Sequence, residues 1–345
     1  MKKIIIHHRS SHHAQNSGYG QLSEYLDGEK LPYLDSKFPY KLAKICSSFF
    51  KKGAGTYDTT SIIKDYELSK RILFGNDKGI VHYLNGERDI RMAIQLNKIK
   101  KKYQFIATFH KPPELFDEYF PNTSYFKKLD GIIAVGKNQV DFLKERLNIN
   151  HVDYIPHGID TSFFYPGTKA RKENVILFVG QHLRDFDALN FAVPRLKEKI
   201  PNLKVHIVLR HDYAKLIDFD SCISIHSGID DFQLRALYQE STLLFLPLKT
   251  STACNSLLEA MACGLPIVST DVGGNFGYVS NDSGVLLPST DIFGMIDTVI
   301  DLLSDSKSLL EMGLNARISA ERMDWKIIAN DVNNFYEKVY GGIKK

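Results

Sequence analysis

The sequence has few of the residues that build metal centres or disulfide frameworks. It holds four cysteines, and none has the paired spacing of a metal site: Cys46, Cys222, Cys254 and Cys263. Cys254 and Cys263 lie among small residues, so we expect buried free thiols and a reducing cytosol. Four histidines occur within residues 7–13, but no acidic or thiol residue accompanies them. We therefore expect no metal site there.

Long apolar runs are also missing. The opening MKKIII is basic and then apolar, but the run stops at His7, which is too short for a signal peptide. No run approaches the roughly 18 apolar residues of a membrane span. The aromatic-interleaved signatures of RNA-binding modules are absent as well. We expect a cytoplasmic protein that does not bind nucleic acid.

What the sequence does have is length and an uneven charge. Its 345 residues, 43% of them hydrophobic and 24% charged, suit two domains. Residues 1–160 carry a net charge of +7 and residues 161–345 carry −3, which gives the chain its +4. A basic half attracts phosphates or anionic lipid.

Short apolar runs alternate with amphipathic stretches, which is typical of parallel sheets flanked by helices. The sequence predicts strands at 3–7, 79–84, 104–110, 131–135 and 152–156, and then at 174–180, 204–210, 222–227, 242–248 and 266–270. It predicts helices at 60–74, 88–101, 138–147, 186–199, 231–240, 255–263, 290–303, 306–321 and 323–340. The stretch 160–174 has proline, glycine and charge without a period, so it reads as a linker between two doubly wound α/β domains.

Ligands of doubly wound sheets bind beyond the carboxyl ends of the strands, and two such sheets facing each other would form one cleft. After the first strand, Gly18 and Gly20 could let the backbone approach a ligand, although the spacing is not GxGxxG. His110, followed by Lys111 and two prolines, ends the third strand. A lone histidine is more often structural, but its place at the carboxyl end of a strand favours hydrogen bonding to a ligand.

The loop after the first strand of the second half contains Gly180 and Arg184. The planar guanidinium of Arg184 could bind a pair of phosphates. Alternatively, Arg184 pairs with Asp185 or Asp187 on a solvated loop.

The stretch KTSTACNSLLEAMACGLPIVSTDVGG, residues 249–274, holds one carboxylate before Asp271, namely Glu259. The preceding loop and helix start suit a diphosphate, with Thr252, Asn255 and Ser256 as additional partners. A carboxylate one turn into that helix would repel phosphates but would accept two O–H bonds from a ribose diol. The alternative is that Glu259 merely complements the helix N-terminus.

Several motifs together resemble the retaining glycosyltransferases of the large family four, which have the GT-B fold of two facing Rossmann-like domains. The block LLEAMACGLPIVSTDVGG carries the resemblance, and FIATFHKPP, IIAVGKNQVDFL, VDYIPHGIDTSFFYP, ILFVGQHLRDFDAL and IDDFQLRALYQESTLLFLPL follow the same order along the chain. The match covers most of residues 79–345.

The resemblance implies an acceptor-binding domain at 1–160 and a domain at 161–325 that binds a UDP- or GDP-linked sugar. It implies that the last helix, about 326–345, returns to the first domain, with Trp325 near the crossing. The implied catalytic residues are His110 and Glu259. The implied donor-side residues are Gly18, Gly180, Arg184, Ser251, Thr252, Ala253, Cys254, Asn255, Ser256 and Glu259. The implied acceptor-side residues are Tyr19, His82, Asn85 and Lys111, and no metal is implied.

Two positions depart from the family pattern. The family places a glutamate eight residues before the ribose-binding one, and this chain has Ser251 there. Gln181 and His182 stand where the family has arginine, and Arg184 could serve instead. The resemblance implies transfer of a sugar to a glycan or lipid-linked acceptor in cell-surface polysaccharide synthesis. The alternatives are an epimerase or phosphorylase of the same fold, or a non-catalytic binding subunit.

Residues 36–52 form a further amphipathic pattern. As a helix they would place Phe38, Leu42, Ile45 and Phe49 on one face, with Lys37, Lys41, Lys44 and Lys51 beside it. The apolar face either packs on the first domain or docks on an anionic membrane, at the inner face of the plasma membrane.

Overall fold

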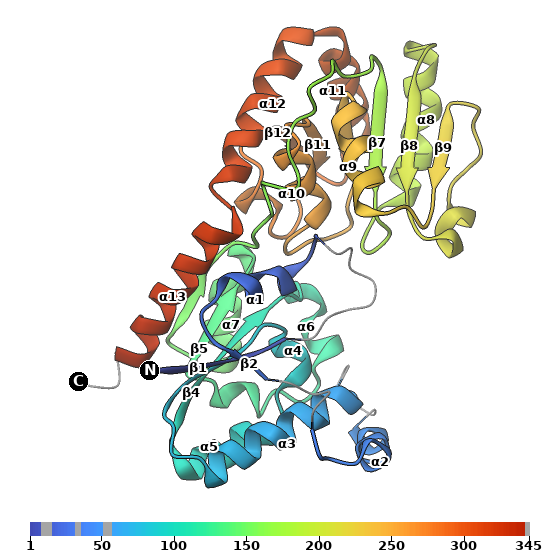
Figure 1. Ribbon diagram of the computed structural model, residues 1–345. Helices are drawn as coiled ribbons and strands as arrows, with labels where there is room; N and C mark the ends of the chain where they lie inside the picture. The colour runs from blue at the N-terminus through green and yellow to red at the C-terminus, as the bar shows by residue number, and fades with distance from the viewer. Residues whose placement is uncertain (8–15, 32–35, 51–56, 342–345) are drawn as a thin grey trace. The chain divides into compact units, whose positions relative to one another are not determined.

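The computed structural model describes residues 1–7, 16–31, 36–50 and 57–341 (Figure 1). The chain divides into two compact units. Unit 1 comprises Met1–Ser11, Tyr19–Pro156 and Lys326–Lys345, and unit 2 comprises His12–Gly18 and His157–Trp325. Each unit holds one six-stranded, fully parallel sheet flanked by helices. In the described part of the chain, no helix is both long enough and apolar enough to cross a membrane.

The sheet of unit 1 has the order β2-β1-β3-β4-β5-β6. Its strands are β1 (Lys2–Ile6), β2 (Glu29–Lys30), β3 (Gly79–Tyr83), β4 (Tyr103–Phe109), β5 (Gly131–Ala134) and β6 (Val152–Tyr154). Its helices are α1 (Leu22–Tyr25), α2 (Tyr40–Phe50), α3 (Thr59–Phe74), α4 (Gly86–Asp89), α5 (Ala93–Lys100), α6 (Pro113–Tyr119) and α7 (Val140–Leu147).

The sheet of unit 2 has the order β12-β11-β10-β7-β8-β9. Its strands are β7 (Val175–Val179), β8 (Lys204–Val208), β9 (Ile223–His226), β10 (Leu243–Leu246), β11 (Ile267–Thr270) and β12 (Gly284–Leu287). Its helices are α8 (Phe186–Lys199), α9 (Asp231–Glu240), α10 (Asn255–Ala262), α11 (Ile292–Ser304) and α12 (Ser306–Glu321). Read from the opposite edge, this is the 3-2-1-4-5-6 strand order of the Rossmann fold.

All ten predicted strands are present within one or two residues of their predicted ends, which confirms the α/β class. Two strands were missed. β2 has only two residues, and β12 is a four-residue edge strand, GVLL, of which three residues are half-buried. The prediction of buried free thiols is confirmed for Cys254 and Cys263, whereas Cys46 and Cys222 are half-buried free thiols.

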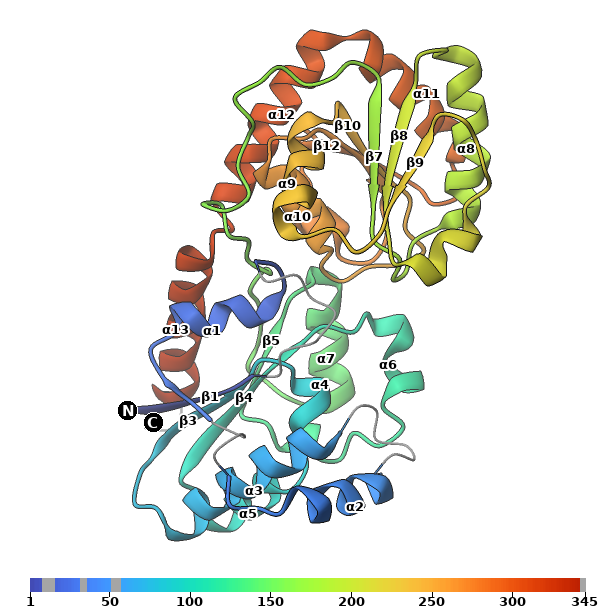
Figure 2. The ribbon, with the colours of Figure 1, turned by 45° about the vertical axis from the view of Figure 1, so that its right-hand side comes forward.

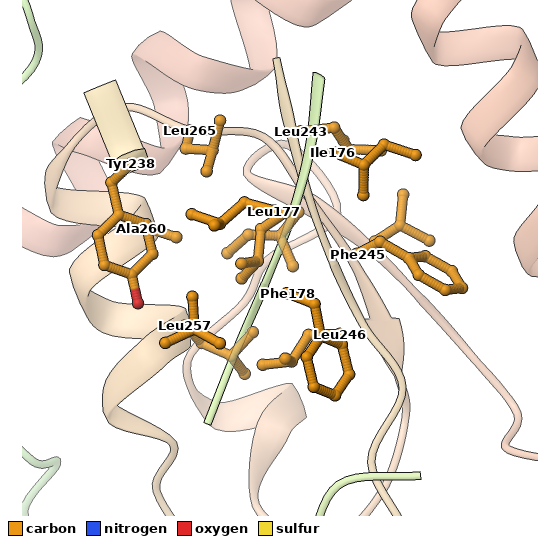
Figure 3. Packing of buried hydrophobic residues seen from close by; sticks show 14 of the residues in the cluster. Ile176, Leu177, Phe178, Tyr238, Leu243, Phe245, Leu246, Leu257, Ala260 and Leu265 are labelled. Carbon is orange, nitrogen blue, oxygen red and sulfur yellow. The ribbon is translucent and has the colours of Figure 1, made fainter. Parts of the chain in front are cut away.

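The core of unit 2 forms where α10 packs on the centre of the sheet. Every residue of β7 and β10 is buried, as expected for strands covered on both faces. Figure 3 shows Leu177 and Leu246 from these strands close to Leu257 of α10, with the ring of Tyr238 beside Ala260. This packing fixes the position of α10 relative to the carboxyl ends of β7 and β10.

Arg171, in the segment before β7, holds two helices at their C-terminal ends. Its Nη1 donates to the carbonyl oxygens of Tyr238 at 2.7 Å and Ser241 at 2.8 Å, where α9 ends. Its Nη2 donates to the carbonyl oxygen of Cys263 at 2.6 Å, just past α10. A single guanidinium therefore satisfies helix-end carbonyls of both α9 and α10.

Helix α13 (Trp325–Gly341) begins in unit 2 and otherwise belongs to unit 1 (Figure 2). Phe335 and Val339 pack so closely on Gly131 that a side chain there would collide with them. The phenol of Tyr336 lies 2.7 Å from Nδ1 of His82, inside unit 1. The indole of Trp325 packs on Gly158 and lies 5.1 Å from the His157 ring, inside unit 2.

The orientation of α2 differs from the packed alternative given above. Small residues, Ala43 and Ser47, are buried against the α3 side of unit 1, whereas Leu42 and Ile45 are 46% and 57% exposed. The helix runs over Tyr40–Phe50 rather than 36–52. Sequence periodicity identified the larger apolar residues as the packed face. Of these, Phe38 does pack on the cluster of Ala43, Ile62 and Ile63, but it lies before the helix. Lys51 and Lys52 lie outside the described residues.

Candidate functional site

The loops that follow β7 and β10 lie side by side, because these neighbouring strands flank the point where the strand order reverses. The amide of Lys249 donates to the carbonyl oxygen of Leu183 at 2.9 Å, and the amide of Asp185 donates to that of Pro247 at 3.0 Å. Apart from Gly18, every donor-side residue implied by the sequence lies in these two loops or in α10. The structure thus brings them to the usual ligand position of a doubly wound sheet.

Gly180 and Arg184 shape the first of these loops. Gly180 has φ +92°, and a Cβ there would lie 2.7 Å from Nη2 of Arg184, so glycine is required on both counts. Nε of Arg184 donates to the carbonyl oxygen of Val179 at 2.8 Å, and Nη2 donates to Oγ of Ser256 at 3.0 Å. Arg184 therefore points to the start of α10.

The alternative pairing of Arg184 with a neighbouring aspartate is not seen. Within the described ranges, no carboxylate lies within ion-pair distance of its guanidinium. Asp185 instead caps α8 by accepting from the amide of Ala188 at 3.1 Å, and Asp187 pairs with Lys249 at 3.6 Å. The guanidinium of Arg184, beside the start of α10, is thus not paired with a carboxylate of the described residues.

The second loop comprises residues 249–254, and it is largely buried from Ser251 onwards. Ser251 and Thr252 are each 5% exposed, and Oγ1 of Thr252 has no hydrogen-bond partner among the described residues. The amide of Gly274 donates to the carbonyl oxygen of Ser251 at 3.0 Å, which holds the loop from the other side. A buried hydroxyl without a partner is costly, so its position favours a polar ligand at this place.

Helix α10 starts directly after this loop. Cys254 precedes it without a side-chain cap, so the N–H groups of the first turn remain available to an anion. Asn255 is the first residue of the helix, and Ala253 is half-buried just before it. The start of α10 therefore offers backbone N–H donors, the hydroxyl of Thr252 and the positive charge of Arg184. These groups together suit a diphosphate.

Glu259 lies one turn into α10 and is 4% exposed. Its Oε2 accepts the hydroxyl of Tyr238 at 2.8 Å, and its Oε1 accepts the hydroxyl of Ser17 at 2.5 Å. Burial raises the pKa of the Glu259 carboxyl, and the two hydroxyls oppose that shift. No cation pairs with it among the described residues, although the charge of Arg184 acts on it in the same stabilising direction as the hydroxyls.

The segment Asn16–Gly18 contacts α9 and α10 inside unit 2. Both the amide and Nδ2 of Asn16 donate to Oδ2 of Asp231, at 2.7 and 3.0 Å. Gly18 follows with φ +93°, the left-handed conformation that glycine adopts without strain. This segment therefore places Ser17 on the carboxylate of Glu259.

In unit 1, His110 follows β4 and is held by two neighbours. Its Nε2 lies 2.8 Å from the carbonyl oxygen of Leu84, and its ring meets that of Tyr19 edge-on at 4.7 Å. Oε1 of Glu87 accepts the amides of His110 and Lys111. The turn after β4 is thus fixed by a carboxylate that the sequence did not single out.

His82 is a fully buried residue of β3. Its ring nitrogens lie 2.7 Å from the Tyr336 hydroxyl and 2.8 Å from that of Thr108, and the Tyr19 hydroxyl is 3.2 Å from the same Thr108 atom. Burial lowers the pKa of His82 to about 3, so the ring is neutral at physiological pH. His82 and Tyr19 thus belong to one buried hydrogen-bond group beside His110.

The other two acceptor-side residues lie nearby in the chain. Asn85 precedes the short helix α4 without capping it through its side chain. Nζ of Lys111 lies 4.3 Å from the ring centroid of Tyr119. In the part of the chain that the structure describes, no three His, Cys, Asp or Glu side chains gather as a metal site would need. Of the early histidines only His7 is described.

Sequence reasoning missed Ser17, Tyr238 and Asp231. Tyr238 belongs to the motif IDDFQLRALYQE, but a tyrosine in a helical pattern is usually interpreted as a core residue. Its hydrogen bond to Glu259 depends on how α9 packs against α10, which the sequence does not show. Ser17 carried no signal beyond the glycines that follow it.

Residues 173–305 match the family model "Glycosyl transferases group 1". The phosphatidyl-myo-inositol mannosyltransferase of Mycolicibacterium smegmatis is 28% identical over 240 residues, which cover 64% of this chain and 60% of that protein. A D-inositol 3-phosphate glycosyltransferase of Corynebacterium aurimucosum is 26% identical over 223 residues, covering 54% and 53%. The matches therefore span between half and two thirds of these relatives.

Solved structures share the fold. HepE of Anabaena, in complex with UDP and glucose, superposes with a TM-score of 0.67 at 11% identity, covering 98% of this chain and 100% of that one. The sucrose-phosphate synthase of Thermosynechococcus elongatus superposes with a TM-score of 0.65 at 16% identity, covering 82% and 79%. These likenesses confirm the GT-B fold that the sequence motifs predicted.

Proposed function

We propose that the chain, whose residues 173–305 match the family model "Glycosyl transferases group 1", transfers a sugar from a nucleotide-diphospho-sugar to a glycan or lipid-linked acceptor. The observation that carries this proposal is the buried carboxylate of Glu259, one turn into α10 and beside the loops of β7 and β10. Unit 2 would bind the donor, and unit 1, with His110, would bind the acceptor.

In this proposal the diphosphate lies at the start of α10. The first-turn N–H groups, Arg184 and the unpaired hydroxyl of Thr252 would stabilise the negative charge that develops as the diphosphate leaves. The ribose would bind Glu259 at Oε1, where Ser17 now donates, because Tyr238 already occupies Oε2. This arrangement needs no divalent cation. Attack of the acceptor from the face of the leaving group would give retention without an enzyme nucleophile.

The donor is either UDP- or GDP-linked. The complexes of HepE hold UDP with glucose and UDP-glucose, which supports a UDP-sugar, whereas the name of the M. smegmatis relative supports mannose. The names of the curated relatives also support an acceptor that contains inositol. Ser251, in place of the family's first glutamate, removes one carboxylate from the sugar side of the site, and we expect it to change which sugar is preferred.

We also propose that unit 1 docks on an anionic membrane through α2. Tyr40, Leu42 and Ile45 are exposed on this helix together with Lys41 and Lys44, and Lys37 is exposed just before it. Apolar side chains with lysines beside them are the pattern of an interfacial helix. Such a contact would bring a lipid-linked acceptor to the unit that binds it.

The proposed function is tested by a screen of UDP- and GDP-sugars against inositol-containing, glycan and lipid-linked acceptors, with products identified by mass. We expect an acceptor-dependent increase of one sugar mass from one donor class. Conversion of the donor without an acceptor would indicate an epimerase. Donor binding without turnover across the panel would indicate a non-catalytic binding subunit.

A further inference from the structure

Helix α12 has an exposed apolar stripe on the side away from its own unit. Its buried residues are small, and Gly313, Ala316 and Ala320 let it pack closely in unit 2. Leu310, Leu314 and Ile318 are 66%, 58% and 48% exposed. Spaced by four, they form one continuous row along the helix. Three large aliphatic side chains in a row on a helix surface are typical of a contact with another molecule.

The charged residues around this stripe are arranged about its centre. Lys307 and Glu321 lie seven positions on either side of Leu314, and their side chains are 84% and 52% exposed. Glu311 and Arg317 lie three positions on either side, and they too have opposite charges. Leu310 and Ile318 lie four positions on either side. If the direction of α12 is reversed about Leu314, each of these charged residues takes the position of a residue of opposite charge, and Leu310 and Ile318 exchange positions.

This pattern is complementary to itself in the antiparallel direction only. With two copies of α12 antiparallel and a twofold axis at Leu314, Lys307 of one copy faces Glu321 of the other, and Leu310 faces Ile318. A parallel pair would place Lys307 against Lys307 and Glu321 against Glu321. We propose that α12 pairs with α12 of a second copy of the chain, in an antiparallel, isologous contact.

The charges also argue against a lipid surface as the occupant. The exposed charges beside the stripe are mixed, with Lys307 and Arg322 against Glu311 and Glu321, whereas an anionic membrane requires a basic surround. Arg317 is directed into unit 2, where it donates to the carbonyl oxygens of Phe164 and Ala262. Both views of the ribbon show α12 at the periphery of unit 2 (Figures 1 and 2). A contact one helix wide is small, so we expect a weak dimer with a dissociation constant of roughly tens of micromolar.

The test is the oligomeric state of the full chain by sedimentation velocity over a concentration series from about 2 to about 200 µM. We expect a reversible shift from monomer to dimer. Leu314→Glu, which places two like charges at the axis, should keep the chain monomeric throughout with an unchanged melting temperature. Phe219→Glu is the matched control, because Phe219 is 96% exposed and outside α12, and it should dimerise normally.

A charge exchange separates this contact from any other apolar association. Lys307→Glu and Glu321→Lys should each weaken the dimer about tenfold, and the double variant should restore it, because opposite charges again face each other. A monomer at every concentration, a dimer that survives Leu314→Glu, or a double variant no better than the single ones would overturn the proposal.

Discussion

The hydroxyl of Tyr238 donates to Oε2 of Glu259 at 2.8 Å, and this contact joins the two helices that flank the proposed donor site. Burial raises the pKa of Tyr238, so the phenol remains a donor at neutral pH. A buried carboxylate on a helix with no paired cation is costly unless hydroxyls stabilise it. Tyr238 thus opposes the rise that burial causes in the pKa of Glu259, and it fixes which of the carboxylate oxygens faces a ligand.

Glu259→Gln tests the ribose role directly. Replacing a charge-assisted acceptor by a neutral amide should weaken turnover more than tenfold, about 2–3 kcal/mol, while the fold persists. Donor turnover and melting temperature should be measured together. Unchanged kinetics would exclude the role, and a collapsed melting temperature would assign Glu259 to structure.

Tyr238→Phe tests the positioning of that carboxylate. Without the phenol, Oε2 loses its donor and the pKa of Glu259 rises further, so donor binding should weaken roughly tenfold near neutral pH. The pH profile of KM should move to higher pH, while kcat at saturating donor changes less. Tyr213→Phe, at a half-buried tyrosine outside the site, is the control. A uniform loss at all pH values would show a purely structural effect.

Ser251→Glu tests whether the site has merely lost the glutamate that the family pattern has at this position, or has become specialised without it. Ser251 is 5% exposed and held through Gly274, so a glutamate there brings a buried negative charge into the loop that leads to α10. We expect lower activity or a changed sugar preference in a competition between donors. Ser251→Ala should be close to native. Higher activity of the glutamate variant with the native donor would contradict a specialised site.

The proposed membrane contact is tested by co-sedimentation with vesicles that contain an anionic lipid. Lys37, Lys41 and Lys44 each add about 1 kcal/mol near such a surface, so replacing all three with glutamate should abolish binding at low salt. Lys98, Lys100 and Lys101, exposed elsewhere in unit 1, give a control variant of equal charge. If both triple variants lose binding equally, overall charge and not α2 is responsible.

His82 makes a prediction about acid stability. Its pKa is about 3 in the folded chain and about 6.5 when unfolded, so the unfolded state binds more protons between these values. Stability should fall as pH drops from 6.5 towards 3, by up to about 5 kcal/mol from this residue. His82→Gln should flatten that slope in urea unfolding. His211→Gln, at an exposed histidine, should leave it unchanged, and equal slopes for all three proteins would refute the assignment.

The fold could be predicted further than the site. Continuous apolar runs such as VILFV and LLFL were enough to identify the central strands of unit 2, and the structure buries every residue of both. Glu259 was identifiable because a lone carboxylate among small residues has few structural explanations. Ser17 and Tyr238 were not, because their role depends on which oxygen they reach. The orientation of α2 was not predictable either, since hydrophobic spacing cannot tell a packed face from an exposed one.

The contacts of Arg171 set a practical limit for dissecting this protein. Its guanidinium donates to carbonyl oxygens at the C-terminal ends of α9 and α10, including that of Tyr238 itself, yet Arg171 lies before the first strand of its sheet and outside the region 173–305 that matches the family model. A fragment that begins at residue 173 would leave the carbonyl oxygens of Tyr238, Ser241 and Cys263 without their shared donor. An isolated form of the proposed donor-binding unit should therefore begin upstream of Arg171, at His157, if its ligand affinity is to be measured.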